Sequence, residues 1–193
     1  VIGIELLSQS LLPAIVHLAE DRQWRIRLAI IEYIPLLAAQ LGRDYFEEQL
    51  SELCMAWLVD NVYSIREAAT INLKNLTERF GADWARTSVV PRISTMHSNA
   101  NFLHRLTSLY AVKVLCAMTP ETIQTLLIPL VVELAQDPVP NIRFNVAKTL
   151  EVLGPKVDAE VCTNTVTPCL TALLQDGDAD VVFFAQRALS TLG

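Results

Sequence analysis

The sequence predicts an all-α solenoid, a superhelix of five antiparallel helical hairpins stacked in chain order. Three observations predict it: a composition that favours helices, a short segment that recurs about every 39 residues, and apolar residues at helical spacing around that segment. The 193-residue chain is 52% hydrophobic and has only six glycines, which favours helices over strands.

The recurring segment begins with Asp or Asn and ends with Arg in four of its five copies. The copies lie at residues 21–27, 60–66, 99–105, 137–143 and 176–182, so their last positions are 39, 39, 38 and 39 residues apart. A second position, about fourteen residues before the last residue of each segment, recurs with it, and we call each such set of equivalent repeat positions a column. This column holds Pro13, Pro91, Pro129 and Pro168, with Glu52 in the second copy. Two columns that keep one period indicate a repeat protein.

Apolar residues on each side of the segment predict two amphipathic helices per repeat. In the fourth repeat the second helix carries Ile142, Val146, Leu150 and Leu153. Short connectors make the two helices antiparallel, and one hairpin cannot bury both apolar faces alone, so neighbouring hairpins stack. We therefore predict a single solenoid over residues 1–193, with repeats at about 5–42, 43–81, 82–118, 119–156 and 157–193. Gly42 and Gly81 are expected to end two second helices.

The Asp and Arg columns predict a structural ladder. We expect each Asp to cap a second helix and each Arg, about two residues inside that helix, to reach an acidic residue or a carbonyl of the neighbouring repeat. The residues are Asp21, Arg27, Asp60, Arg66, Asp137 and Arg143. The third repeat has the neutral Asn99, and the fifth has Val182 in place of Arg.

A column three residues before that Arg predicts a surface that binds another protein. It holds Trp24, Tyr63 and Phe102, followed by Pro140 and Ala179, and the sequence places it on the turn between the two helices of each repeat. Equivalent turns lie side by side in a solenoid, so the rings would form a ridge, and aromatic residues and Arg are enriched at interface hot spots. Arg25 beside Trp24 fits the same interpretation. The alternative is that each ring packs against the adjacent helix as a local staple.

Composition excludes several classes of protein. A net charge of −6 argues against a generic nucleic-acid or anionic-membrane partner, and no apolar run approaches the length of a transmembrane helix. The first residues lack the features of a secretory signal and are expected to lie inside a longer protein. The four cysteines form no CxxC pair, so we expect reduced packing thiols in a cytoplasmic and nuclear protein.

The residues that catalysis would need do not converge anywhere in the repeat. His17, His97 and His104 fall at unrelated repeat positions without metal-ligand spacing, and the chain has no glycine-rich phosphate loop and no GxSxG motif. We therefore expect no enzymatic activity, no cofactor and no metal.

The repeated segments resemble HEAT repeats, and longer stretches resemble one family closely. These stretches are Leu6–Val16, Trp24–Tyr33, Leu53–Leu58 and Asn141–Lys148, and they are similar to the C-terminal repeats of the scaffold (A) subunit of protein phosphatase 2A. The resemblance implies a non-catalytic scaffold that binds the phosphatase catalytic subunit through intra-repeat turns. It also implies that regulatory B-type subunits bind mainly to N-terminal repeats beyond the five found here.

Carried over by position, the resemblance implies catalytic-subunit contacts at Trp24, Arg25, Tyr63, Phe102, Val139 and Pro140. A different HEAT adaptor, of the nuclear-transport or chromosome-organising kind, is the alternative. Such an adaptor would bind protein partners on its concave helix face.

Overall fold

The computed structural model describes residues 11–192, and within this range all regular secondary structure is helical. The chain divides after residue 81 into two compact units. The first unit contains α2 (Leu12–Ala19), α3 (Trp24–Leu41), α4 (Arg43–Gln49), α5 (Ser51–Ala56), η2 (Trp57–Val59) and α6 (Tyr63–Phe80). The division falls where the second predicted repeat ends.

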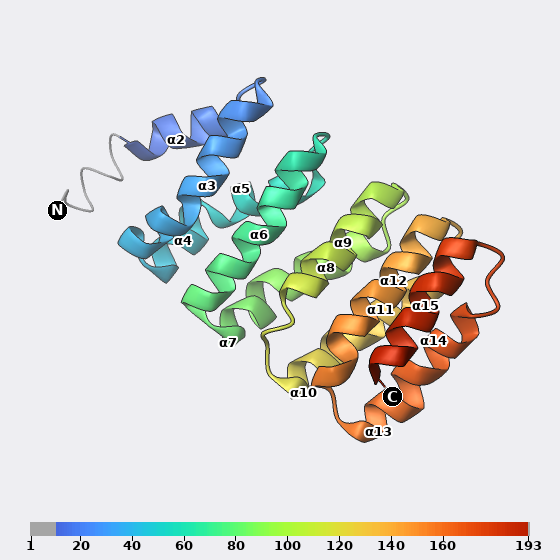
Figure 1. Cartoon of the computed structure of the whole chain (residues 1–193). Coiled ribbons are helices and arrows are strands. Elements are labelled where there is room, and N and C mark those ends of the chain that lie inside the picture. The colour runs from blue at the N-terminus through green and yellow to red at the C-terminus, as the bar shows by residue number, and fades with distance from the viewer. Residues whose placement is uncertain (1–10, 193) are drawn as a thin grey trace. The chain divides into compact units, whose positions relative to one another are not determined.

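The second unit contains three hairpins. Its elements are α7 (Ala82–Trp84), η3 (Ala85–Val89), α8 (Val90–His97), α9 (Phe102–Val114), α10 (Pro120–Thr122), η4 (Ile123–Leu127), α11 (Ile128–Glu133), η5 (Leu134–Gln136), α12 (Pro140–Leu153), η6 (Gly154–Lys156), α13 (Ala159–Val161), η7 (Cys162–Val166), α14 (Thr167–Leu173) and α15 (Ala179–Leu192). Helix α12 packs against both α9 and α15 (Figure 1).

In the first unit, α3 and α6 pack side by side as the second helices of two hairpins (Figure 1). Both end at a glycine with positive φ, +81° at Gly42 and +91° at Gly81, which is a conformation that side chains with a Cβ rarely adopt. The two hairpins are also joined by the buried indole of Trp57, which donates to the Ala19 carbonyl at 3.1 Å.

The first helix of each hairpin in the second unit is interrupted by a π-helical turn just before the proline column. These turns are η3, η4 and η7, and Pro91, Pro129 and Pro168 follow them inside the first turn of α8, α11 and α14. Proline has no backbone N–H and its ring clashes with the carbonyl four residues earlier, so a wider turn relieves the conflict. The proline column therefore coincides with a change of helix type inside the first helix of these repeats.

The apolar pattern of α12 is buried as expected, since Ile142, Val146, Leu150 and Leu153 have no exposed surface. The corresponding residues of α3 are Ile26, Ile30, Ile34 and Leu37, and of these only Ile34 is buried. Within its unit α3 packs against one second helix, α6, whereas α12 lies between two. The predicted all-α solenoid class is confirmed, because each unit is a stack of helical hairpins.

Three arginine side chains join consecutive turns, as the ladder hypothesis predicts, whereas the hydrogen bonds of Arg66 run to the carbonyls of Asp60 and Asn61 in its own turn. In the first unit Arg27 donates to both carboxylate oxygens of Asp60, at 2.9 and 3.0 Å. In the second unit Arg105 donates to Asp137 at 2.6 and 3.0 Å, and Arg143 donates to Asp176 at 2.6 and 2.9 Å. Each pair is a bidentate, charge-assisted ion pair between one repeat and the next.

One detail of the ladder hypothesis is wrong, the capping role of the Asp column. Each Arg is the fourth residue of its helix, since α3, α6, α9 and α12 each begin three residues before it. Asp21, Asp60 and Asp137 are not helix caps: the cap residues are Gln23, Val62 and Val139, whose side chains make no capping hydrogen bond. The carboxylates instead bond the backbone two residues on, a local alternative that Asp and Asn adopt readily.

We expect Arg105→Lys to lower the free energy of local opening of α12 by about 2 kcal/mol, because an ammonium cannot supply the fork that Asp137 accepts. Native-state hydrogen exchange of the 193-residue chain measures this, and α3 in the other unit should be unaffected.

The matched control for this prediction is Arg86→Lys. Arg86 pairs with Asp83, whose side chain is 86% exposed, so its loss should cost less than about 0.5 kcal/mol. Equal losses in the two variants would contradict the structural role of the ladder.

Candidate protein-docking surface

The five turns between first and second helices share one geometry. In each, a side-chain oxygen of Asp or Asn accepts the backbone N–H two residues later, at 2.7 to 2.9 Å; the accepting residues are Asp21, Asp60, Asn99, Asp137 and Asp176. Four turns are also held by their own Arg, which donates to the carbonyl of the Asp or Asn at 2.7 to 2.8 Å. The turn that presents each candidate residue is therefore fixed by polar contacts of its own.

In the first unit, the predicted aromatic residues stand at the first position of a second helix. Trp24 begins α3 and is half-buried, while Tyr63 begins α6 and is 53% exposed. The guanidinium of Arg25 lies 4.5 Å from the centre of the Trp24 ring, and the Tyr63 hydroxyl contacts Glu67 at 3.2 Å. A Trp with a stacked Arg offers a large apolar area next to a charged donor.

In the second unit, Phe102 begins α9 and is 39% exposed. Val139 is the residue before α12, and Pro140 is its first residue; both are half-buried. Proline suits this first position because its missing N–H would have no helical partner. Each unit thus carries its predicted residues at the starts of second helices, and the ridge along all the repeats stays a prediction.

The exposure of Tyr63 and Phe102 bears on the choice between docking and stapling. A ring that acted mainly as a staple would be covered by the adjacent helix, yet about half of Tyr63 and over a third of Phe102 are open to solvent. Trp24 is half-buried, and the Arg25 guanidinium lies over its ring, so this ring is compatible with either role. Tyr63 and Phe102 are therefore accessible to a partner, and the choice between docking and stapling stays a prediction.

Two carboxylates of the ladder, Asp137 and Asp176, have a lowered pKa. Burial alone would raise the pKa of Asp137, but hydrogen bonds from Arg105 and from the Val139 N–H outweigh it and lower this pKa. The hydrogen bond from Arg143 lowers the pKa of Asp176. Both groups stay ionised at neutral pH and hold the turns of α12 and α15.

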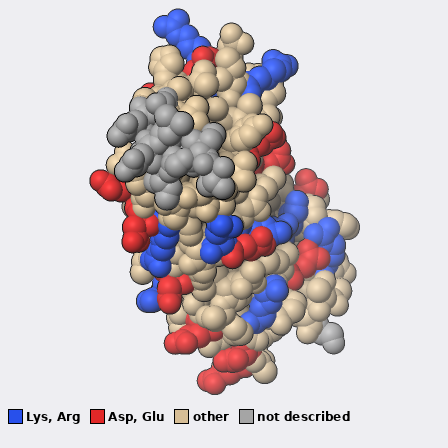
Figure 2. All heavy atoms as spheres, turned by 90° about the vertical axis from the view of Figure 1, so that its left-hand side faces the viewer, with Lys and Arg blue, Asp and Glu red and all other residues tan. Residues whose placement is uncertain are grey.

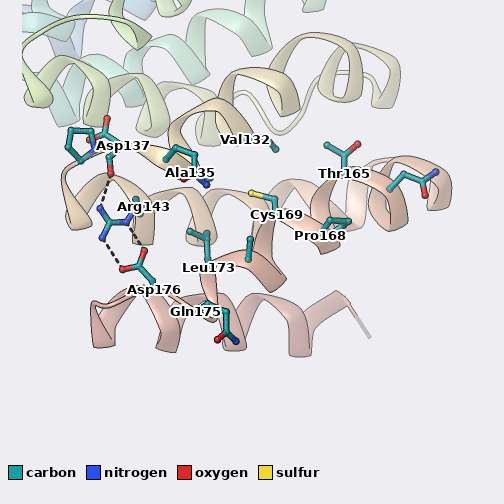
Figure 3. Close-up of a pocket in the computed structure, with 14 residues that line it drawn as sticks. Val132, Ala135, Asp137, Arg143, Thr165, Pro168, Cys169, Leu173, Gln175 and Asp176 are labelled. Atoms are coloured by element: carbon teal, nitrogen blue, oxygen red, sulfur yellow. Dashed lines mark hydrogen bonds and ion pairs between the residues drawn. The ribbon is translucent and has the colours of Figure 1, made fainter.

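A groove of about 700 Å³ in the second unit was not predicted from the sequence. The pair Arg143–Asp176 lies at one end of it and Thr165 at the other (Figure 3). Cys169 lines its side, and burial raises the pKa of this thiol to about 11, so the thiol is neutral at physiological pH. The groove is lined by two first helices, by the turns that follow them and by Arg143 of α12, so no short motif marks it.

A contact between a buried histidine and an exposed glutamate was also missed. His97, 6% exposed at the end of α8, has its Nε2 atom 3.1 Å from a carboxylate oxygen of Glu133 at the end of α11. Because the two residues are 36 positions apart, neither spacing nor local pattern could reveal the pair. It links the first helices of two consecutive repeats.

Several other features concern the chemistry that the chain can support. Within residues 11–192 no three His, Cys, Asp or Glu side chains gather as metal ligands, and no described helix is long and apolar enough to cross a bilayer. Burial raises the pKa of Cys54 to about 12.

Basic and acidic side chains lie intermingled on the described part of the face in Figure 2, unlike the continuous basic surface of many nucleic-acid-binding proteins.

Comparison with known sequences matches residues 127–157 to the HEAT repeat. The chain is 50% identical over 127 residues to the protein phosphatase PP2A regulatory (A) subunit of Saccharomyces cerevisiae, which covers 61% of this chain and 20% of that protein. The Schizosaccharomyces pombe protein of the same name is 53% identical over 76 residues, covering 39% and 13%. The predicted resemblance to the PP2A scaffold protein is confirmed.

A human relative, the beta isoform of the 65 kDa regulatory (A) subunit of serine/threonine-protein phosphatase 2A, is 53% identical over 54 residues, covering 28% of this chain and 9% of that protein. The chain thus spans about one fifth or less of the length of the curated relatives it matches.

Solved structures of repeat proteins share the fold. The chain aligns over 98% of its length with Cex1p, at a TM-score of 0.70, 12% identity and 38% of that chain. It also aligns over 98% of its length with a designed armadillo repeat protein, at a TM-score of 0.54, 18% identity and 85% of that chain. At these identities the likeness concerns the fold alone.

The lowered pKa of Asp137 gives a prediction for acid stability. Its folded-state pKa lies below the ordinary value of 3.8, so its stabilising contribution is complete above that value and is lost as the pH falls through the folded-state pKa. We expect helicity, followed by circular dichroism, to fall with acidification below about pH 4, and less steeply in Asp137→Asn.

The matched control is Asp83→Asn, which removes a carboxylate that is 86% exposed. It should titrate like the unmodified chain. An Asp137→Asn variant with an unchanged acid transition would show that this carboxylate does not couple folding to pH.

Proposed function

We propose that this chain is part of a non-catalytic scaffold that binds the catalytic subunit of a type 2A serine/threonine phosphatase through its intra-repeat turns. The observation that carries the proposal is the exposure of Tyr63 and Phe102 on turns held by internal hydrogen bonds, in a chain whose relatives are PP2A regulatory (A) subunits. Regulatory B-type subunits would bind mainly to other repeats of the whole protein. We expect the complex in the cytoplasm and nucleus.

Geometry at the turns supports the proposed contacts. A partner that covers Trp24 and Tyr63 buries large rings without first breaking the hydrogen bonds of the turns, because those bonds run to the Asp and Arg columns. A surface that is already ordered loses little conformational entropy on binding. Arg25 can also donate to a carboxylate or carbonyl of the partner.

Direct binding of the purified chain to the purified catalytic subunit of a type 2A phosphatase tests the proposal. We expect saturable binding that leaves the phosphatase active site free to hydrolyse a small phosphomonoester. Failure of the folded chain to bind this phosphatase would reject the proposal. It would favour the alternative of a different HEAT adaptor that binds partners on its helix face.

We expect Trp24→Ala combined with Tyr63→Ala to weaken binding to the catalytic subunit by more than about 2 kcal/mol, because truncated aromatic anchors at an interface cost this much. Biolayer interferometry measures the dissociation constant, and circular dichroism should show unchanged helicity.

The control for this double variant is Tyr33→Ala combined with Leu36→Ala. These side chains are 61% and 57% exposed on α3, away from the turn, so their loss should leave the affinity unchanged. If the turn variant binds as tightly as this control, the aromatic residues are staples and do not form the docking surface.

A further inference from the structure

A cluster of aromatic and basic side chains lies on α12 and α15, apart from the turns. The rings of Phe144 and Phe184 are 5.4 Å apart between centroids, and those of Phe183 and Phe184 are 5.2 Å apart in an edge-to-face arrangement. Both helices are second helices that pack side by side in the second unit (Figure 1). Three rings from two repeats therefore form one contiguous aromatic cluster.

Two cations contact the middle ring of this cluster. Lys148 Nζ lies 4.9 Å from the Phe184 centroid and 5.8 Å from that of Phe144, while the Arg187 guanidinium lies 4.8 Å from Phe184. Arg187 is also bound at 3.0 and 2.5 Å by both carboxylate oxygens of Glu151. The charge of Arg187 is thus balanced within the chain.

Lys148 is in a different position, because no carboxylate in the described residues pairs with it. Its ammonium has three N–H donors, and aromatic faces satisfy such donors only partly. Lys148 is half-buried among the rings, so less water reaches it than reaches a lysine on an open helix face. The cluster therefore presents one uncompensated positive charge.

Phe183 supplies an apolar surface next to that charge. Its side chain is 59% exposed, although Val181 and Ala185 of the same helix are fully buried and already provide the core contacts of α15. One exposed apolar residue needs no explanation. An exposed ring that continues into two further rings and an unpaired ammonium does have the composition of a binding surface.

We propose that this cluster binds a short acidic segment of a partner protein in which a carboxylate side chain stands beside an aromatic or large aliphatic one. The carboxylate accepts from Lys148 Nζ, and the apolar side chain covers Phe183. A basic segment would meet the unpaired ammonium as a like charge. A nucleic acid would require several unpaired cations, and this surface offers one.

Fluorescence anisotropy of the 193-residue chain with two short labelled peptides tests the proposal. One peptide alternates Asp and Phe within a Gly-Ser background, and the other replaces every Asp by Lys. We expect the acidic peptide to bind at least about tenfold more tightly than the basic one. Both peptides are compared at about 150 mM salt, where the long-range repulsion from the chain's net charge of −6 is screened beyond about 8 Å.

Substitutions localise the site. Lys148→Met and Phe183→Ser should each raise the dissociation constant of the acidic peptide about tenfold or more, whereas Lys148→Arg, which keeps the charge, should retain binding. Lys74→Met and Tyr33→Ser are the matched controls, since both residues are exposed on second helices of the other unit. Neither control should change the affinity.

A charge reversal gives the sharpest outcome. Lys148→Glu should lose the acidic peptide and gain affinity for the basic one, a change that a general loss of folding cannot produce. Equal binding of the two peptides to the unmodified chain would overturn the proposal. So would an acidic-peptide affinity that Lys148→Met and Lys74→Met leave equally unchanged.

Discussion

The described structure depends on one interaction, in which an arginine side chain donates hydrogen bonds both to its own turn and to the next turn along the chain. Arg143 shows the arrangement completely: one nitrogen donates to the Asp137 carbonyl of its own turn, and two others donate to the carboxylate of Asp176 in the following turn. The planar guanidinium makes these contacts together because its donors point in fixed directions. Each such side chain therefore sets both the shape of a turn and its spacing from the next.

This arrangement explains how the turns can display apolar residues and remain ordered. Isolated loops are usually polar and mobile, since their backbone groups need water. Here the carbonyl and N–H groups of each turn are bonded by the Asp and Arg columns, as at Asp60 and Arg66. The first residue of the second helix, which is Tyr63 in α6 and Phe102 in α9, can then face solvent. One column maintains the turn, and its neighbour is available for a partner.

The parts of the structure that follow from the repeat could be predicted from the sequence, and the parts that depend on side-chain packing could not. The repeat period predicted where the hairpins lie. Arg27, Arg105 and Arg143 each bond a carboxylate of the next repeat, as the ladder hypothesis predicts. The π turns before the prolines had a signal in Pro91 and its equivalents, but a helical apolar pattern continues through such a turn. The pair of His97 with Glu133 and the groove beside Cys169 had no local signal, because residues more than 20 positions apart in the sequence build each of them.

The aromatic and basic cluster follows a different physical logic from the turns. The chain carries a net charge of −6, so at long range it repels an acidic segment. Salt screens that repulsion beyond about 8 Å under physiological conditions, whereas the half-buried ammonium of Lys148 and the ring of Phe183 act at contact distance. Selection at this surface must therefore come from short-range fit, a single carboxylate beside an apolar side chain. A long polyanion would gain one favourable contact and be repelled by the net charge of −6 of the chain, which makes a compact acidic motif the better match.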